Sequence, residues 1–157
     1  MTDLKDKSYP GADASTDDVL YLASWYYQAA FVLWKETSRI TVYKYDPLAF
    51  MPARLLTIHA IEMCLNAFLR HEGLSAKDVR ARQHDINEPS FIKALKLKPK
   101  TANHLRDLTA RREYLAARYA PERSRDLSEI NRLEATLAEV MVKVTAYIRS
   151  GETLQDQ

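Results

Sequence analysis

Apolar residues recur at helical spacing along most of the chain, and the clearest stripe lies between Pro52 and Gly73. Pro52 suits a first helical turn, where its missing N–H would have no partner, and Gly73 suits the left-handed residue that follows a helix. The stripe recurs every three or four residues, through Ile58, Ile61, Leu65, Phe68 and Leu69. The pattern predicts a helix with one face in the core.

The last third of the chain carries a second strong stripe. Asp126, with Glu129 three residues later, is typical of a helix start, and Gly151 is typical of a helix end. The apolar positions between them step by three or four residues: Ile130, Leu133, Leu137, Val140, Val144 and Ile148. We expect a long final helix that ends at Gly151.

A first helix is predicted from Ser15, which forms a capping-box pattern with Asp18, to about Arg39. One apolar face of this helix holds Val19, Leu22, Tyr26, Ala29 and Leu33. Other faces are apolar as well, through Trp25, Tyr27, Phe31 and Trp34. Such a helix is either central to a bundle or shared with a second copy of the chain. We expect most of it to be core and the remainder to be a dimer contact.

The segments between these helices have weaker patterns. Residues 40–51 are β-branched and aromatic and are interrupted at Asp46-Pro47, which fits either an extended connection or a frayed helix end. Capping residues and prolines then predict three further helices, over 75–84, 89–97 and 101–119. In the last of these, we expect the inward positions to be Leu105, Leu108, Leu115 and Tyr119.

These patterns predict an all-α protein, a single antiparallel helical bundle of about five to six helices. We expect the bundle to span residues 15–151, between a loose tail at 1–14 and a short tail at 152–157. A length of 157 residues suits one domain. Only three glycines occur, and none forms a glycine-rich phosphate loop, which excludes dinucleotide and P-loop sites.

The composition of the chain also indicates where in the cell the protein is located. Cys64 is the single cysteine, so no disulfide can form within the chain, and a reducing, cytoplasmic location is the default. The first residues lack a signal-peptide core, and no apolar run approaches the ~20 residues of a membrane span. We expect no membrane association and no cofactor.

Charge is uneven along the sequence, although the net charge is only +2. Residues 1–69 hold 6 Lys or Arg and 8 Asp or Glu, residues 70–125 hold 14 and 7, and residues 126–157 hold 3 and 6. The middle segment is therefore +7 between two acidic flanks. It could attract an anionic partner, or it could simply be a solvated basic face.

Glu62 is the first candidate for chemistry, because it is a carboxylate within an apolar helix. A buried carboxylate needs a cation or a donor from another helix. The candidates are Arg111, Arg112 and Arg118, and we expect a structural ion pair between Glu62 and Arg112 rather than a catalytic group.

His84-Asp85 is the second candidate. Arg80 precedes His84 by one helical turn and Arg82 is close, so a phosphate site or proton transfer is one interpretation. The structural alternative is that Arg80 and His84 contact the carbonyl groups of a helix end while Asp85 caps the next segment.

A third candidate is the stretch RREYLAARY, residues 111–119. Arg111, Tyr114 and Arg118 are spaced by three and four residues and would share one helix face. Arginines beside a tyrosine suit phosphates and bases, and they equally suit a carboxylate such as Glu62. His59 and Glu62 also share a face, but one such pair lacks the further ligands of a metal site, so we expect no metal.

Three stretches, IHAIEMCLNAFLRHEG, RARQHDI and RREYLAARYAPE, together resemble the HEPN superfamily of small helical-bundle domains. The shared elements are a helix with an embedded glutamate, a histidine-aspartate-aliphatic element and an arginine-tyrosine helix end, here Glu62, His84, Asp85, Ile86, Arg118 and Tyr119. The resemblance covers about residues 52–121.

This resemblance implies an all-α, commonly dimeric domain linked to nucleotides, to RNA cleavage or to a partner nucleotidyltransferase. Ribonuclease members of the family carry an arginine, four to six residues and then a histidine on a late helix. This chain departs from that pattern, because no histidine follows Arg106. Arg54 and His59 have the spacing, but they lie on the early helix.

We therefore expect a non-catalytic, homodimeric binding module for a nucleotide, RNA or an acidic partner. His84, Arg80, Arg111, Tyr114 and Arg118 would bind the ligand. The first alternative is a metal-independent, toxin-like ribonuclease at a dimer cleft. It would use Arg54 with His59, or His84 with Arg80. The second alternative is a protein-interaction scaffold without a ligand.

Overall fold

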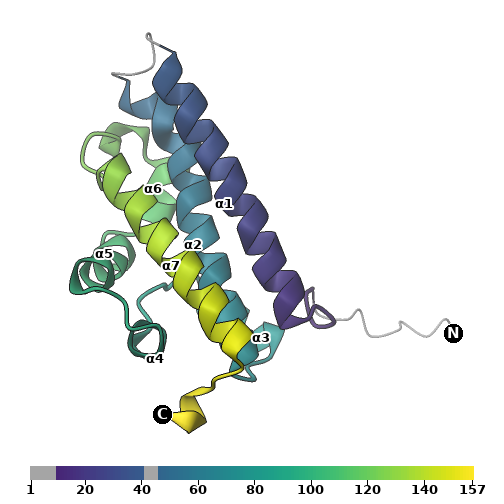
Figure 1. The fold of residues 1–157 in the computed structure, drawn as a ribbon. Helices are drawn as coiled ribbons and strands as arrows, with labels where there is room; N and C mark the ends of the chain where they lie inside the picture. The colour runs from purple at the N-terminus through teal and green to yellow at the C-terminus, as the bar shows by residue number, and fades with distance from the viewer. Residues whose placement is uncertain (1–9, 41–45) are drawn as a thin grey trace, which may run out of the picture.

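The computed structural model describes residues 10–40 and 46–157, and within these ranges it contains helices and no strands. Seven α-helices are present, against the five to six expected: α1 (Thr16–Arg39), α2 (Met51–His71), α3 (Ala76–Arg80), α4 (Pro89–Ala94), α5 (Pro99–Ala110), α6 (Glu113–Tyr119) and α7 (Ile130–Ser150) (Figure 1). Three short 3₁₀ segments accompany them: η1 (Pro47–Phe50), η2 (Pro121–Arg123) and η3 (Leu154–Asp156). The all-α class is confirmed.

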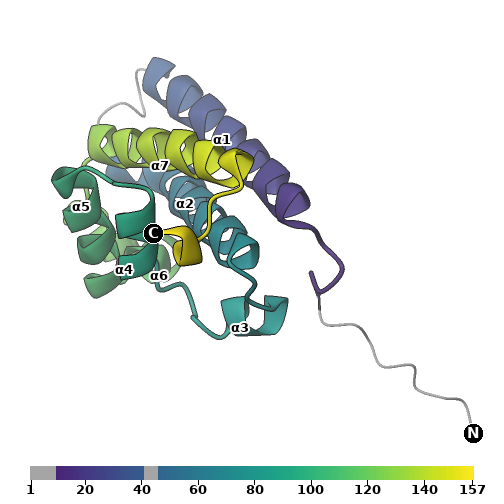
Figure 2. The ribbon, with the colours of Figure 1, turned by 60° about the horizontal axis from the view of Figure 1, so that its bottom comes forward.

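Helix α2 is the centre of the fold. It packs against α1 on one side and against α6 and α7 on others, and α4, α5 and α6 lie across α2 from α1 (Figures 1 and 2). Its expected stripe is buried in full, since the five side chains are at most 4% exposed: Ile58, Ile61, Leu65, Phe68 and Leu69. Burying such side chains stabilises the fold by about 1.5–3 kcal/mol each.

The three long helices are not antiparallel throughout. Helix α1 runs opposite to α2, whereas α2 and α7 run in the same direction (Figure 1). Contacts at both ends support the parallel direction of α2 and α7. Arg54 near the start of α2 bonds to the Ser128 carbonyl just before α7, and His71 at the end of α2 lies 2.7 Å from the Glu152 carbonyl just after α7. The long connection through α3 to α6 returns the chain to the start of α2 and permits this direction.

Several predicted helix ends are confirmed. Ser15 and Asp18 form the capping box, Ser75 caps α3, and Gly73 and Gly151 have the positive φ angles of residues that follow a helix. The predicted cap at Asp126 is wrong. Helix α7 begins only at Ile130, and no side chain caps it, because the preceding segment is held by contacts with α6 instead.

The core face of α1 differs from the prediction. Its buried residues are Leu20, Ala23, Ala30 and Trp34, and Trp34 donates a 2.8 Å hydrogen bond to the Thr57 hydroxyl of α2. Leu22, which we expected inside, is 46% exposed. A helix that is apolar on several faces does not specify from its own sequence which face turns inward.

The predicted helix over 101–119 is broken in two at Arg112, which has a left-handed backbone with φ 52°. Residues on either side of the break therefore do not share one helix face, and Tyr119 is 67% exposed rather than inward. No glycine or proline marks this position, so the sequence carried no signal for the break.

Both ends of the described chain contact α2. Arg70 donates hydrogen bonds to the carbonyls of Ala12 and Ala14, and the Glu72 carboxylate accepts from the backbone N–H of Leu154. The predictions for residues 1–9, and for residues 41–45 of the first connection, fall outside the described residues.

The helical stretch Pro47–His71 is long and apolar enough to cross a membrane by length and composition, and 56% of its most apolar window is buried inside the fold. The core helix of a bundle meets the same criteria, because it also needs a continuous apolar sequence. Length and composition therefore do not distinguish the two cases here.

Candidate functional site

The turn after α3 presents His84 to the side of α2. Gln83 and His84 are consecutive residues with positive φ angles of 50° and 68°. Non-glycine residues adopt this conformation at a cost of order 1–3 kcal/mol and only where the surroundings hold them. Here the Arg82–Glu88 ion pair at 2.8 Å and the buried side chain of Ile86 fix the turn.

His84 is hydrogen-bonded to Glu62, the carboxylate of α2. Its Nδ1 lies 3.0 and 3.1 Å from the two Glu62 oxygens. Because a carboxylate only accepts, Nδ1 carries the hydrogen, and Nε2 is the nitrogen that remains for a ligand. His59 Nδ1 lies 3.7 Å from Glu62, so the carboxylate is placed between two imidazoles.

The charge state of Glu62 follows from these neighbours. Burial of the carboxyl would raise its pKa, but the imidazoles of His59 and His84 lower it, and the net effect is a pKa below the usual range. Glu62 is therefore a carboxylate near neutral pH, suited to orienting an imidazole.

Tyr114 of α6 covers one face of the His84 ring. The two rings stack with centroids 4.1 Å apart and planes inclined by 21°. The guanidinium of Arg118 then lies 5.4 Å from the Tyr114 ring centroid and 4.8 Å from that of Tyr119, within the range of cation–π contact. We call this series, Glu62, His84, Tyr114 and Arg118, the stacked cluster.

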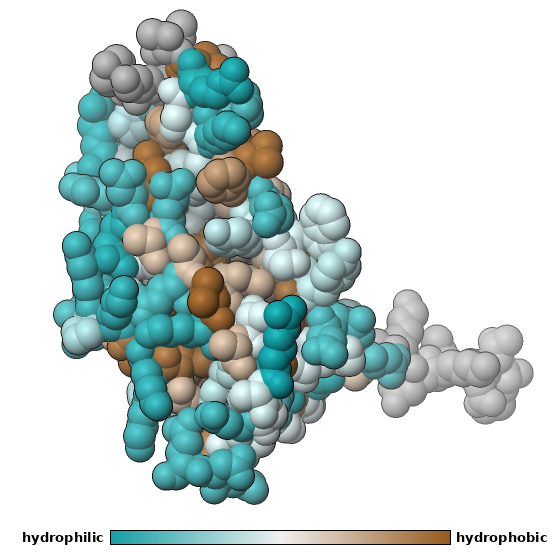
Figure 3. Space-filling model, viewed as in Figure 1, coloured by the Kyte–Doolittle hydropathy of each residue, from teal (hydrophilic) through white to brown (hydrophobic). Residues whose placement is uncertain are grey.

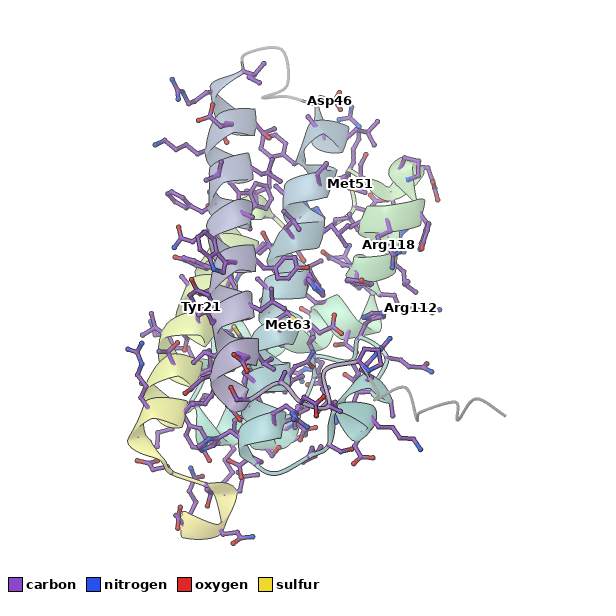
Figure 4. The ribbon with its side chains drawn as sticks, turned by 90° about the vertical axis from the view of Figure 1, so that its right-hand side faces the viewer. Tyr21, Asp46, Met51, Met63, Arg112 and Arg118 are labelled. Atoms are coloured by element: carbon purple, nitrogen blue, oxygen red, sulfur yellow. The ribbon has the colours of Figure 1, made fainter. Side chains whose placement is uncertain are left out.

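Two members of the stacked cluster, His84 and Tyr114, line a cavity of about 230 Å³. The polar side chains that line this cavity come from the turn after α3 and from the α5–α6 junction: Gln83, His84, Asp85, Thr109, Arg112 and Tyr114. Apolar side chains complete it, from Ile58, Ile86, Leu108 and Leu115. Figure 4 shows Arg112 and Arg118 at the two ends of α6, across α2 from Tyr21 of α1. The volume suits a phosphate or one planar ring rather than a large ligand.

Three left-handed residues meet at this cavity. Gln83 and His84 line it from one side and Arg112 from the other, and they are three of the four non-glycine residues with positive φ among the described residues. Backbone strain of this kind clusters at functional sites, where the surrounding structure over-determines the geometry. The cavity is therefore the strongest candidate for a site.

The structure brings together only part of the predicted set. His84, Tyr114 and Arg118 meet in the stacked cluster. Arg111 lies at the end of α5, before the break at Arg112, and pairs with Glu113 at 3.6 Å. Arg80 lines a different cavity, beside the N-terminal segment and α1.

The predicted ion pair between Glu62 and Arg112 is not formed among the described contacts. Glu62 pairs with imidazoles, and the enclosed ion pair of the fold is instead Arg54 with Glu113, 3.6 Å apart. The prediction failed because the left-handed backbone of Arg112 rotates α6 and turns Glu113, rather than the arginine, inward.

The alternative catalytic pair of Arg54 and His59 is also separated. Arg54 is 5% exposed and donates a 2.6 Å hydrogen bond to the Ser128 carbonyl. His59 instead packs edge-on against Tyr26, with ring centroids 4.5 Å apart. A guanidinium enclosed in this way cannot reach a phosphate together with His59.

Sequence reasoning missed two polar residues of the cavity, Gln83 and Thr109, and assigned Arg112 to an ion pair with Glu62 instead of to the cavity. Thr109 accepts a 3.3 Å hydrogen bond from the Ile86 backbone N–H and so holds the turn against α5. No local motif marks these residues. In the part of the chain that the structure describes, no group of three or more His, Cys, Asp or Glu residues could hold a metal ion.

Comparisons of the chain with protein-family models, curated proteins and solved structures found no match. The resemblance to HEPN domains therefore stays a prediction, and function has to be inferred from the residues of the site.

Proposed function

We propose that this protein binds a phosphate-bearing nucleotide unit, free or within RNA, at the cavity bordered by the stacked cluster. The observation that carries the proposal is the continuous stack of His84, Tyr114 and Arg118 beside a cavity that also contains Arg112. Arginine forks suit phosphate oxygens, and aromatic faces and guanidinium planes suit bases.

Charge supports the same ligand. The segment 70–125, which supplies the turn and α6, carries +7. A phosphate bound in the cavity would meet the guanidinium group of Arg112 and the imidazole of His84, which the Glu62 carboxylate orients, while Arg118 adds positive charge beside Tyr114. Binding that depends on such contacts weakens as salt rises, because counterions compete for the phosphate.

Fluorescence anisotropy with labelled ATP and with a short single-stranded RNA at low salt tests the proposal. We expect Arg118→Gln and Tyr114→Leu each to weaken binding at least tenfold, since one base stack is worth about 1–3 kcal/mol. Arg149→Gln, which removes an exposed charge at the end of α7, is the matched control and should leave the affinity unchanged. Absence of binding, or equal loss in all three variants, would refute the proposal.

Cleavage of RNA is the second candidate, and the Glu62–His84 hydrogen bond favours it. A carboxylate that orients an imidazole is an arrangement used for general acid–base catalysis, which typically contributes ~10²–10⁴ in rate. Incubation of the protein with labelled RNA in EDTA decides between binding and cleavage. Cleavage that His84→Gln abolishes and Arg149→Gln retains would make the protein an enzyme, whereas intact RNA excludes this candidate under those conditions.

A further inference from the structure

Helices α1 and α7 form the two walls of an apolar groove of about 430 Å³, which shares no residue with the cavity at the stacked cluster. Figure 3 shows the face of the molecule on which the two helices lie side by side, with hydrophobic surface among hydrophilic side chains. The wall from α1 is aromatic. Its three rings are spaced by four and three residues and so share one helix face: Tyr27, Phe31 and Trp34. This space is called the α1–α7 groove below.

The wall from α7 leaves the groove open, because two of its residues are small. Ala135 and Ala138 line it, where longer side chains would fill the space between the helices. Trp34 is fixed on the opposite wall. It is 3% exposed, stacks on Phe50 with ring centroids 5.6 Å apart, and donates a 2.8 Å hydrogen bond to the Thr57 hydroxyl. The groove is therefore preformed on that side.

Glu134 is the only charged side chain that lines the groove. The ion pairs between described residues do not include it. Asn131 precedes Glu134 by one helical turn on the same face of α7, so an amide oxygen and a carboxylate stand on one wall and aromatic rings on the other. A primary ammonium group has three donors and no acceptor, and its charge is attracted both to a carboxylate and to aromatic faces.

The volume of the groove limits the occupant to a small molecule. Two turns of a helix, about 10 Å in diameter and about 11 Å long, occupy roughly 850 Å³, about twice the 430 Å³ of the groove. Small-molecule sites measure about 300–1,000 Å³. A fatty acid or a phosphate would place a like charge against Glu134, whereas an ammonium group would complement it.

We propose that the α1–α7 groove binds a small primary amine with an aromatic body. The ammonium group donates to Glu134 and Asn131, and the ring packs against Tyr27 and Phe31. This ligand is opposite in charge to the nucleotide proposed for the stacked cluster, and the two sites share no residue. The amine site therefore does not depend on the proposed function.

Nuclear magnetic resonance of the full chain, labelled with nitrogen-15, tests the proposal by titration with phenethylamine and, separately, with phenethyl alcohol. The two probes have the same ring and chain and differ in that a hydroxyl replaces the ammonium group. We expect phenethylamine to shift the signals of the Trp34 indole N–H and of the Ala135 and Ala138 amides. It should bind about tenfold more tightly than the alcohol, because a hydrogen bond to a charged group is stronger than a neutral one.

Variants separate the charge of the groove from its shape. Glu134→Gln keeps the shape and removes the charge, so it should weaken phenethylamine about tenfold and leave phenethyl alcohol unchanged. Glu129→Gln is the matched control, because Glu129 is an exposed carboxylate just before α7 that does not line the groove. It should change neither affinity. Ala138→Leu should weaken both probes, because the longer side chain fills the groove.

Several outcomes would overturn the proposal. Equal affinity of the wild type for the two probes, or equal weakening by Glu134→Gln and Glu129→Gln, overturns the role of the carboxylate. Unshifted Trp34 and Ala138 signals at millimolar phenethylamine overturn the site itself. Anisotropy of Glu134→Gln with labelled ATP and RNA reports the nucleotide proposal separately. It should equal the wild type, because Glu134 does not line that cavity.

Discussion

Two carboxylates, Glu62 on the central helix and Glu113 on α6, have different surroundings. Glu113 is fully buried, faces Arg54 and accepts two hydrogen bonds from Ser128 at 2.9 and 2.7 Å. Glu62 keeps a side chain that is 15% exposed and faces the imidazole of His84, which is itself 43% exposed. A carboxylate enclosed with a guanidinium fixes the geometry of the fold, whereas one at the surface with an imidazole is accessible to a ligand and to protons.

This difference shows why a glutamate in an apolar helix does not by itself reveal its role. The expected structural pair was assigned to Glu62, and the structure gives that role to Glu113. Removal of a partner from an enclosed pair leaves an uncompensated charge, which is far more costly than the loss of a contact at the surface. Measurements of the free energy of unfolding therefore distinguish the role of Glu113 from that of Glu62.

The largest effect is expected for Glu113→Ala. Loss of this carboxylate leaves Arg54 buried without its ion-pair partner and should lower the free energy of unfolding by about 3–5 kcal/mol. Urea denaturation measures this change. The double replacement Arg54→Met with Glu113→Leu should recover most of it, because the buried charges are removed together. Exposed Glu122→Ala is the control and should change the value by less than about 0.5 kcal/mol.

The second prediction concerns His104 of α5, a buried side chain that is 6% exposed. Burial and the nearby charge of Arg132 lower its pKa to about 4, from 6.5 in the unfolded chain. The unfolded state therefore binds more protons between these values, and stability should fall as the pH drops from 6.5 toward 4. The expected loss is on the order of 2 kcal/mol.

Urea denaturation of the wild type and of His104→Gln at several pH values measures this contribution. The variant should lose most of the dependence between pH 6.5 and 4. The dependence that remains in this range reports other groups. Glu62 contributes little to it, because its pKa is lowered and its stabilisation is lost only at more acidic pH. Equal slopes for both proteins would show that His104 is not held neutral by the fold.

The smallest effect on stability is expected for Glu62→Gln. The amide retains an acceptor for the His84 Nδ1–H, so the free energy of unfolding should fall by only about 1 kcal/mol. Ligand affinity should also decrease, because an amide can donate as well as accept and no longer fixes which nitrogen of His84 carries the hydrogen. Thermal melts measure the stability of the variant, and fluorescence anisotropy on the same sample measures its ligand affinity. A loss of stability as large as that of Glu113→Ala would make Glu62 a structural residue.

Much of the scaffold could be predicted from the chain. Apolar periodicity identified the core face of α2 and of α7, and Ser15, Gly73 and Gly151 marked helix ends, because these signals depend on neighbouring residues alone. The inward face of α1 could not be predicted, since Trp25 and Trp34 make two faces apolar and only contact with α2 selects between them.

The candidate site was predicted in part. His84, Tyr114 and Arg118 were identified as residues suited to a ligand, but Glu62 was paired with Arg112 rather than with His84. The reason is the left-handed backbone at Arg112, which breaks the predicted helix without a glycine or proline, so residues before and after it do not share one helix face.

By itself, the sequence determined the helical class, the principal core stripes and the residue types available for binding, since these depend on local spacing and chemistry. Only the tertiary structure decided that Glu62 meets His84, that Glu113 is enclosed with Arg54, and that Trp25 of α1 faces outward. Those outcomes depend on the angles at which helices meet, and such angles are set by the whole set of contacts rather than by any one segment.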